Sequence, residues 1–512
     1  MSYNFLIKKG TIIDGSGKPR RKADIGLKNE KIEKVGLIKE KEDSKKTKEI
    51  NASDLIVCPG FIDIHSHADC TIPFDPKTVS TIHQGITTLV VGNCGTSLAP
   101  INPDKKAIYE KEFNLMAPPG EKYNITWKTF AEYLTQMEKL GCSSNVAHLV
   151  GFSNLRLATL GYNEREPSGI ELSQMRNFLR ESMDSGAFGL STGLIYTPQS
   201  YAKTKEIIEL AKVVGEYKGL YFSHIRSEGD QIIEAMNEFL EIVEKSKCAG
   251  GQIAHHKISG KKNWGKSKDT LKLIAEANKK GLNITADQYP YTRGMTSLTT
   301  LLPPSSHIGG IDQLLTKLKS PTEREKIRKS MLKGENYESF VKSLGWENIF
   351  LATAETPKWR KYEGYSFTEI AKELKMKDEF DILCEILIDG KAKGSMTIES
   401  MNEKDIKKIM LSPFVMIGSD SSPVAHTGKL SYGKPHPRYY GTYPRILGKY
   451  VSEEKVLKLE EAIRKMTSFP ASKLGLSDRG LIKEGYYADI VIFDSKKIID
   501  KATYTNPHKF PE

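Results

Sequence analysis

The chain has 512 residues, of which 38% are hydrophobic and 27% are charged, a composition typical of a globular protein with enough apolar residues for a core. Its 76 basic and 64 acidic residues give a formal charge of +12, but the lysines are scattered over helix-like segments, which argues against a nucleic-acid or membrane partner. No run approaches the roughly 20 apolar residues that span a bilayer. Residues 1–9 lack a signal-peptide pattern and the six cysteines form no CxxC pair, so we expect a cytoplasmic protein without disulfides.

Both ends of the chain are rich in strand-like runs. Residues 3–57 contain short runs separated by tight turns, of which Asp14-Gly15-Ser16-Gly17 is the clearest. Near the other end, residues 488–494 form another strand-like run, which follows Gly480 and Gly485. We therefore expect one small β-sandwich domain, built from residues 1–57 together with residues 472–512.

Eight apolar runs occupy the middle of the chain, and each ends in polar or small residues. The runs are residues 61–65, 88–94, 146–150, 188–191, 220–224, 252–255, 284–289 and 414–420. Helical patterns fill most of the gaps between them. Eight buried strands that alternate with helices predict an α/β fold, a (β/α)8 TIM barrel over residues 58–471, with its chemistry at the C-terminal ends of the strands. The long gap before the eighth run predicts a small insertion at residues 292–352.

Residues of metal-ligand type close five of these runs. His65 and His67 end the first run, and residues i and i+2 of an extended segment point the same way. The second, fifth, sixth and eighth runs end in Cys94, His224, His255 and Asp420. Any one of these side chains alone is compatible with a structural role. Six of them at the same end of one barrel indicate a metal site.

The donor set predicts both the metal and the class of reaction. A mixture of imidazole, thiolate and carboxylate favours Zn²⁺ over Mg²⁺ or Ca²⁺, and a thiolate can bridge two ions, so one or two metals are expected. Water bound to zinc becomes a hydroxide nucleophile at neutral pH. Asp420 is the one carboxylate of the set, and we expect it to act as general base and then as general acid toward a leaving nitrogen. The predicted chemistry is metal-assisted hydrolysis.

The sequence resembles the D-aminoacylase (N-acyl-D-amino-acid deacylase) family of the amidohydrolase superfamily. Residues 59–67, PGFIDIHSH, are similar to the opening signature of the superfamily. Further matching stretches are GNCG at 92–95, GLSTGLIY at 189–196, SHIRSE at 223–228, HHK at 255–257, ADQYPY at 286–291, GSD at 418–420 and HPR at 436–438. The cysteine motif is the specific one, because most relatives bridge their metals with a carboxylated lysine or a glutamate. The resemblance runs from about residue 3 to residue 495.

This resemblance implies a zinc-dependent amidohydrolase that converts an N-acyl-D-amino acid into a D-amino acid and a carboxylate. It implies that one zinc ion is held tightly by Cys94, His224 and His255. A second metal site, weak or vacant, is implied at His65, His67 and Asp420. The free carboxylate of the small-molecule substrate is implied to be clamped by Tyr196, Lys257, Tyr289 and Arg438. Guanidinium, ammonium and phenol donors suit a carboxylate.

Two other substrate classes stay open. The same clamp would accept a dipeptide with a C-terminal D-residue. A cyclic-amide hydrolase of the hydantoinase or dihydroorotase type is disfavoured, because the resemblance implies that Cys94 takes the position of the bridging lysine of those enzymes. His256 is adjacent to His255, but His255 comes first after the apolar run and matches the family, so we expect His256 to be structural. The loop at residues 421–435 looks longer than the family version, and we expect it to influence which side chain is accepted.

Overall fold

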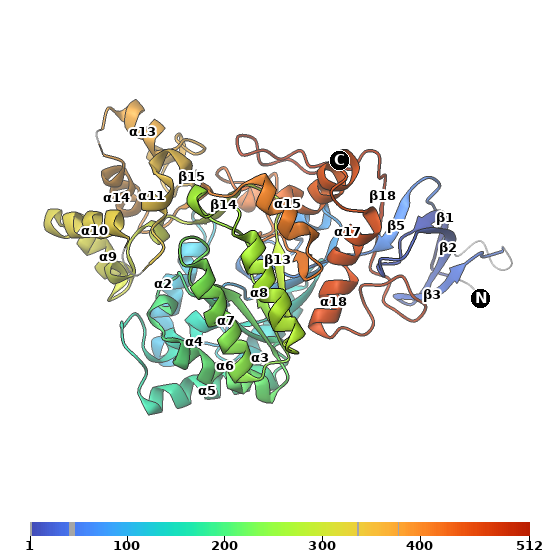
Figure 1. The fold of residues 1–512 in the computed structure, drawn as a ribbon, viewed down its shortest axis with the longest axis horizontal. Helices are drawn as coiled ribbons and strands as arrows, with labels where there is room; N and C mark the ends of the chain where they lie inside the picture. The colour runs from blue at the N-terminus through green and yellow to red at the C-terminus, as the bar shows by residue number, and fades with distance from the viewer. Residues whose placement is uncertain (1–2, 40–46, 335–336, 377) are drawn as a thin grey trace.

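The computed structural model describes residues 3–39, 47–334, 337–376 and 378–512. A central β/α barrel carries a small sheet formed by both ends of the chain and a separate unit inserted late in the barrel (Figure 1). The terminal sheet and the inserted unit lie toward opposite ends of the long axis of the molecule (Figure 1). The barrel therefore lies between two accessory units.

The barrel has the eight strands that the sequence predicts. They are β6 (Phe61–Asp63), β7 (Ile86–Val91), β8 (Asn145–His148) continued by β9 (Val150–Gly151), β10 (Gly189–Gly193), β11 (Leu220–His224), β12 (Gly250–Ile253), β13 (Ile284–Gln288) and β17 (Val415–Ile417). Neighbouring strands pair in parallel from β6 to β8 and from β9 to β17. The third strand is interrupted at Leu149, and a parallel bridge between Ser66 and Ser421 joins the first strand to the last. All residues of β10, β11 and β13 are buried, as expected for parallel strands covered on both faces.

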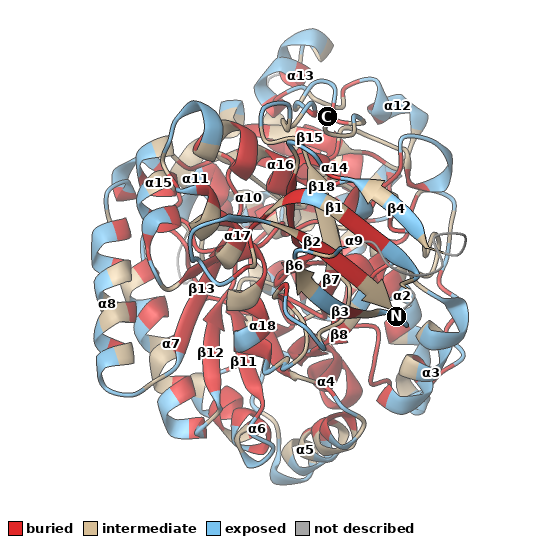
Figure 2. Cartoon of the chain, turned by 90° about the vertical axis from the view of Figure 1, so that its right-hand side faces the viewer, coloured by how far each residue is buried: buried red, intermediate tan, exposed pale blue. Residues whose placement is uncertain are grey.

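Helices cover the outside of the barrel. They include α3 (Phe130–Leu140), α4 (Phe152–Thr159), α5 (Gly169–Asp184), α6 (Thr204–Glu216), α7 (Ile232–Ser246), α8 (Ser267–Lys279), α15 (Glu403–Leu411), α17 (Leu459–Met466) and α18 (Ser468–Leu474). In α6, Ile207, Leu210 and Val214 are buried at helical spacing. Figure 2 shows buried residues in the strands and on the inner helix faces, with exposed residues outside. Within the described part of the chain, no helix is long and apolar enough to cross a membrane.

The terminal sheet combines strands from the two ends of the chain. Its order is β18 (Ile490–Phe493), β5 (Ile56–Pro59), β1 (Phe5–Ile12), β2 (Arg21–Lys28) and β3 (Lys31–Gly36), with β4 (Lys48–Asn51) also paired to β1. Ile7, Ile12, Ile25 and Ile32 are buried in its core. One residue, Gly60, separates β5 from the first barrel strand, so the sheet is anchored directly to the barrel. The division into residues 1–57 with 472–512 and residues 58–471 stays a prediction.

Residues 293–399, within the chain between β13 and β17, form the inserted unit. Its antiparallel sheet has the order β14 (Arg293–Ser297), β16 (Ser395–Glu399) and β15 (Ile349–Thr353). Its helices are α9 (Ile311–Lys319), α10 (Pro321–Lys333), α11 (Phe340–Leu344), α12 (Pro357–Arg360), α13 (Phe367–Leu374) and α14 (Glu379–Asp389). Buried apolar residues from Leu298 to Ile398 form a core of its own. The range predicted for the insertion, residues 292–352, ends too early, because α12–α14 and the central strand β16 complete this core.

A buried ion pair joins α4 to α6. Nη1 of Arg156 donates to both carboxylate oxygens of Glu206, at 2.6 and 2.7 Å, and both side chains are buried. We expect Arg156→Ala to lower the free energy of unfolding by about 3–5 kcal/mol, because Glu206 would remain buried without its partner. Chemical denaturation measures the change, with Lys245→Ala, which breaks an exposed ion pair to Glu241, as a control of small effect. A loss below about 1 kcal/mol at Arg156 would contradict this expectation.

Candidate metal centre

The barrel brings the six predicted metal-ligand residues to one end. His65 and His67 follow β6, Cys94 follows β7, and His224 is the last residue of β11. His255 and Asp420 follow β12 and β17. All are buried except His67, whose side chain is 24% exposed. Parallel strands of a barrel end at the same rim, so residues distant in sequence share one site.

Two sets of these side chains are each close enough together to hold a single ion, and both include His65. One set is His65, Cys94 and His255, and the other is His65, His67 and Asp420. The Sγ of Cys94 lies 3.4 Å from Nε2 of His65 and 3.4 Å from Nε2 of His255. Oδ1 of Asp420 lies 3.2 Å from Nε2 of His67 and 3.5 Å from Nε2 of His65. The thiol therefore lies between imidazoles, and the carboxylate lies beside the HxH pair.

His224 is a buried imidazole without a hydrogen bond. Neither of its ring nitrogens has a hydrogen-bond partner among the described residues. Its ring lies edge-on to that of His255, with centroids 4.4 Å apart. Buried polar atoms in folded proteins almost always have a partner, so an imidazole without one, in a cluster of thiol, imidazole and carboxylate, fits the role of a metal ligand.

Backbone strain is concentrated in the same cluster. Cys94, His255 and Asp420 have φ angles of +53°, +36° and +50°, in the left-handed region that favours glycine. Each such conformation costs on the order of 1–3 kcal/mol and persists only where the surroundings enforce it. One contact that helps to hold Asp420 in this conformation is a hydrogen bond from its backbone N–H to the carbonyl oxygen of His65, at 2.8 Å. Strain of this kind is typical of functional sites.

The charges of the cluster favour ionised ligands. Burial raises the pKa of the Cys94 thiol, but the imidazoles of His255, His65 and His224 outweigh burial and bring this pKa well below its ordinary value. Burial also raises the pKa of Asp420, yet Arg438 and the neighbouring imidazoles hold it well below the usual range. A thiolate and a carboxylate are the forms that bind a metal ion.

Two carboxylates that sequence reasoning did not single out orient the imidazoles. Glu228 Oε1 lies 3.0 Å from Nδ1 of His255 and accepts a hydrogen bond from Lys257 Nζ at 2.6 Å, and the same Nζ lies 2.7 Å from Nδ1 of His255. Asp287 Oδ1 accepts the backbone N–H of His255 at 2.7 Å and lies 3.1 Å from Nδ1 of His65. A carboxylate on Nδ1 leaves Nε2 free for a metal. An acidic residue inside the buried run 284–289 is the sequence signal that could have pointed to Asp287.

The structure separates the neighbours His255 and His256. His256 Nε2 lies 2.9 Å from the hydroxyl of Thr270, on α8. Burial lowers the pKa of His256 to about 4, so this ring is neutral. His256 therefore points away from the cluster, and His255 faces it.

A cavity of about 490 Å³ opens onto the cluster and is lined by all four residues predicted to bind the substrate carboxylate. The guanidinium carbon of Arg438 lies 4.6 Å from the ring centroid of Tyr289, and Lys257 Nζ lies 5.6 Å from it. Tyr196 is packed against the ring of His224, with its hydroxyl 3.2 Å from that of Thr296. Lys257, Tyr289 and Arg438 thus form one group, and Tyr196 lies beside the metal cluster.

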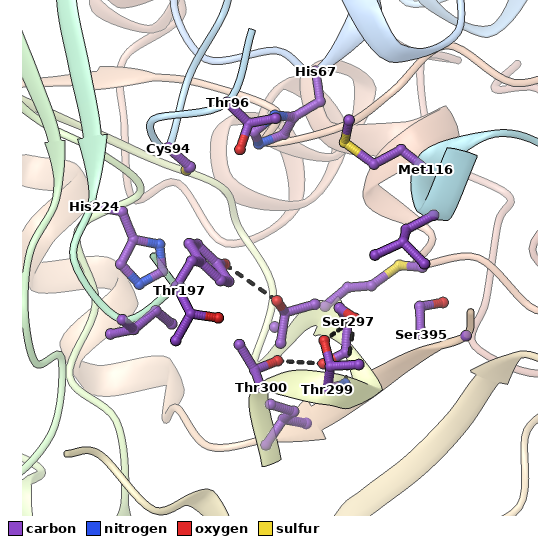
Figure 3. A pocket seen from close by; sticks show the side chains of 18 of the residues that line it. His67, Cys94, Thr96, Met116, Thr197, His224, Ser297, Thr299, Thr300 and Ser395 are labelled. Carbon is purple, nitrogen blue, oxygen red and sulfur yellow. Dashed lines mark hydrogen bonds between the residues drawn. The ribbon is translucent and has the colours of Figure 1, made fainter. Parts of the chain in front are cut away.

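Other walls of the cavity come from the inserted unit and from the loop at residues 421–435. Figure 3 shows His67, Cys94 and His224 around one part of the cavity, with Ser297, Thr299 and Thr300 of the inserted unit opposite them. From the loop, the lining residues are Ser422, Val424, Tyr432 and Pro435. Both segments therefore meet any molecule that reaches the cluster.

Comparisons with known proteins agree with this geometry. The profile of the Amidohydrolase family matches residues 48–302 and 372–511, leaving out most of the inserted unit. The chain is 32% identical to a D-aminoacylase of Alcaligenes xylosoxydans xylosoxydans over 99% of this chain and 91% of the relative. It is also 32% identical to an N-acyl-D-glutamate deacylase of the same organism, over 98% and 90% of the two chains.

A solved structure has the same fold along the whole chain. It is the N-acyl-D-glutamate deacylase of Bordetella bronchiseptica, complexed with zinc and a phosphonate inhibitor that mimics the tetrahedral intermediate. The TM-score is 0.81 at 31% identity, covering 100% of this chain and 94% of the other. The L-hydantoinase of Arthrobacter aurescens, at 14% identity and a TM-score of 0.53, shares the fold alone.

Proposed function

The chain belongs to the amidohydrolase family, and we propose that it hydrolyses the amide bond of N-acyl-D-amino acids with zinc as its cofactor. The products are a D-amino acid and a carboxylate. The observation that carries the proposal is the buried cluster of Cys94 between two imidazoles, beside an orphaned His224 and a cavity with an arginine and a lysine. The full-length likeness to D-aminoacylase and to two N-acyl-D-amino-acid deacylases supports the substrate class.

The donor set supports zinc. Cys94, His224 and His255 would hold the tightly bound ion, and His65, His67 and Asp420 would form the weaker site. Glu228 and Asp287 would orient His255 and His65 from behind. When bound, zinc polarises the scissile carbonyl group and lowers the pKa of a water molecule.

Asp420 is the residue that would move the proton. Its carboxylate is buried beside the HxH pair and is ionised, so it can accept a proton from the attacking water. The same carboxyl group would then return this proton to the amide nitrogen as the C–N bond breaks. No other carboxylate of the described chain is within such distance of both His65 and His67.

The clamp would orient the substrate by its free carboxylate. The side chain of Arg438 is buried, its Nη1 lies 2.8 Å from Asp420 Oδ2 and its Nη2 donates to the carbonyl oxygen of Met295 at 3.5 Å, whereas Nε has no hydrogen-bond partner among the described residues and stays available for the substrate. Lys257, Tyr289 and Tyr196 would supply ammonium and phenol donors around it.

Removing the guanidinium tests the clamp. We expect Arg438→Ala to raise KM by about 10²-fold for substrates with a free carboxylate, since a charge-assisted hydrogen-bonded pair contributes about 1.5–3 kcal/mol. Steady-state kinetics with an N-acyl-D-amino acid and its carboxamide measures the difference. The carboxamide is the control, and an equal effect on both compounds would refute the clamp.

The direct test of function is amine release from paired N-acetyl-D- and N-acetyl-L-amino acids by the purified protein with added Zn²⁺. We expect release from D-substrates only. If the zinc-loaded protein releases no amine from any D-substrate, the proposal is refuted. Dipeptides with a C-terminal D-residue belong in the same panel, because the clamp would accept them. The cytoplasmic location stays a prediction.

A further inference from the structure

Every cation that the structure describes on the cavity wall already has an acidic partner. These cations are Arg226, Lys257, Lys393 and Arg438. Arg226 pairs with Glu238 through two hydrogen bonds of 2.9 Å. The partners of the other three are Glu228 at 2.6 Å from Lys257, Asp420 at 2.8 Å from Arg438 and Glu355 at 3.7 Å from Lys393. The cavity therefore offers no unpaired cation among its described lining residues.

Carboxylates outnumber cations on the same wall. Against those four cations, the described lining includes Glu112, Glu164, Glu228, Glu338, Glu355 and Asp420. Glu338 comes from the inserted unit and accepts the backbone N–H of Glu228 at 2.8 Å, next to Lys257. Once the clamp is occupied, the described wall therefore has no positively charged side chain without a partner that could receive a second anion.

The part of the wall that faces the metal cluster is uncharged. Hydroxyl groups of the inserted unit occupy it (Figure 3). Their hydrogen-bonding capacity is largely used, since Ser297 Oγ lies 2.8 Å from Thr299 Oγ1, Thr300 donates to Ser297 O, and Thr296 faces the hydroxyl of Tyr196. Leu194, Ile195 and Met116 add apolar surface. Such a wall suits a neutral group.

From this charge balance we propose that the cavity accepts N-acyl-D-amino acids with an uncharged side chain and rejects those of D-aspartate and D-glutamate, an inference that rests on the proposed function. The clamp is occupied by the substrate's α-carboxylate. A second carboxylate would be buried without a partner, which is costly wherever in the cavity it lies. This cost arises whichever wall of the cavity faces the side chain.

The sharpest test compares N-acetyl-D-glutamine with N-acetyl-D-glutamate, which differ in charge but hardly in shape. We expect kcat/KM to be at least about tenfold higher for the glutamine compound, equivalent to about 1.4 kcal/mol. A smaller ratio, or a preference for glutamate, overturns the inference.

Binding separates a failure of this inference from a failure of the proposed function. If neither compound is hydrolysed, the proposed function fails, and calorimetric titration of both compounds into the zinc-loaded enzyme still tests the charge argument. Tighter binding of the glutamine compound supports the inference. Equal or tighter binding of the glutamate compound, or no binding of either, overturns it.

A variant that adds a positive charge to the wall tests whether the lack of a cationic partner is the reason that the glutamate compound is rejected. Thr299 lies on the uncharged wall and is half-buried. We expect Thr299→Lys to shift the kcat/KM ratio toward the glutamate compound by about tenfold, because it supplies the missing partner. Thr299→Met is the matched control of similar length without charge, and it should leave the ratio unchanged. An unchanged ratio in the lysine variant, or an equal shift in the methionine variant, contradicts the proposal.

Discussion

Replacing Cys94 with alanine is expected to remove both the tightly bound zinc and the activity. The Sγ of Cys94 lies 3.4 Å from imidazole nitrogens of His65 and His255, which lower the pKa of the thiol and favour its thiolate form. Without it, the tight site loses its one anionic ligand. Zinc measured by elemental analysis after dialysis should fall from about one ion per chain to near zero.

Cys70→Ala is the matched control for this variant. Cys70 is also buried and also lines the cavity, but its thiol contacts Met116 and Asp69 rather than an imidazole. We expect this variant to keep its zinc and its activity. Full retention of zinc in Cys94→Ala would refute the role proposed for the thiolate.

Asp420→Asn is expected to lower kcat by about 10²–10⁴-fold, the range of a lost general base. The amide has nearly the shape of the carboxylate but cannot accept the proton of the attacking water. The tight zinc should remain, since Cys94, His224 and His255 are untouched. Steady-state kinetics and elemental analysis on the same preparation separate the loss of the base from the loss of the metal.

Glu355→Gln is the control for this effect. Glu355 is a second carboxylate on the cavity wall, and it pairs with Lys393 instead of the imidazole cluster. We expect it to change kcat little. An Asp420→Asn enzyme with nearly normal kcat would place the base elsewhere.

The barrel and the identity of its strand-end residues were predictable from the sequence. Parallel strands covered on both faces are continuous apolar runs, so all eight are visible locally. The HxH pair, the cysteine and the acid then follow those runs directly. That the strand ends lie at one rim is a property of the fold class, so residues as distant as His65 and Asp420 could be grouped.

The extent of the inserted unit depended on tertiary pairing. Strand β16 joins β14 across about a hundred residues, and it lies in the middle of its sheet. Nothing local at residues 395–399 identifies that partner. The core of the unit closes only when this strand is in place, which is why the predicted end at residue 352 was too early.

By itself, the sequence determined the barrel, the pairing of the two chain ends and the kinds of ligand atom at the rim, because these depend on hydrophobic periodicity and on residue type. Only the tertiary structure decided that Asp287 and Glu228 contact the Nδ1 atoms of the imidazoles, that three rim residues adopt left-handed backbone, and that each cavity cation has a carboxylate partner. These properties are distances and angles between side chains from different strands. They arise when the barrel closes, and no local pattern encodes them.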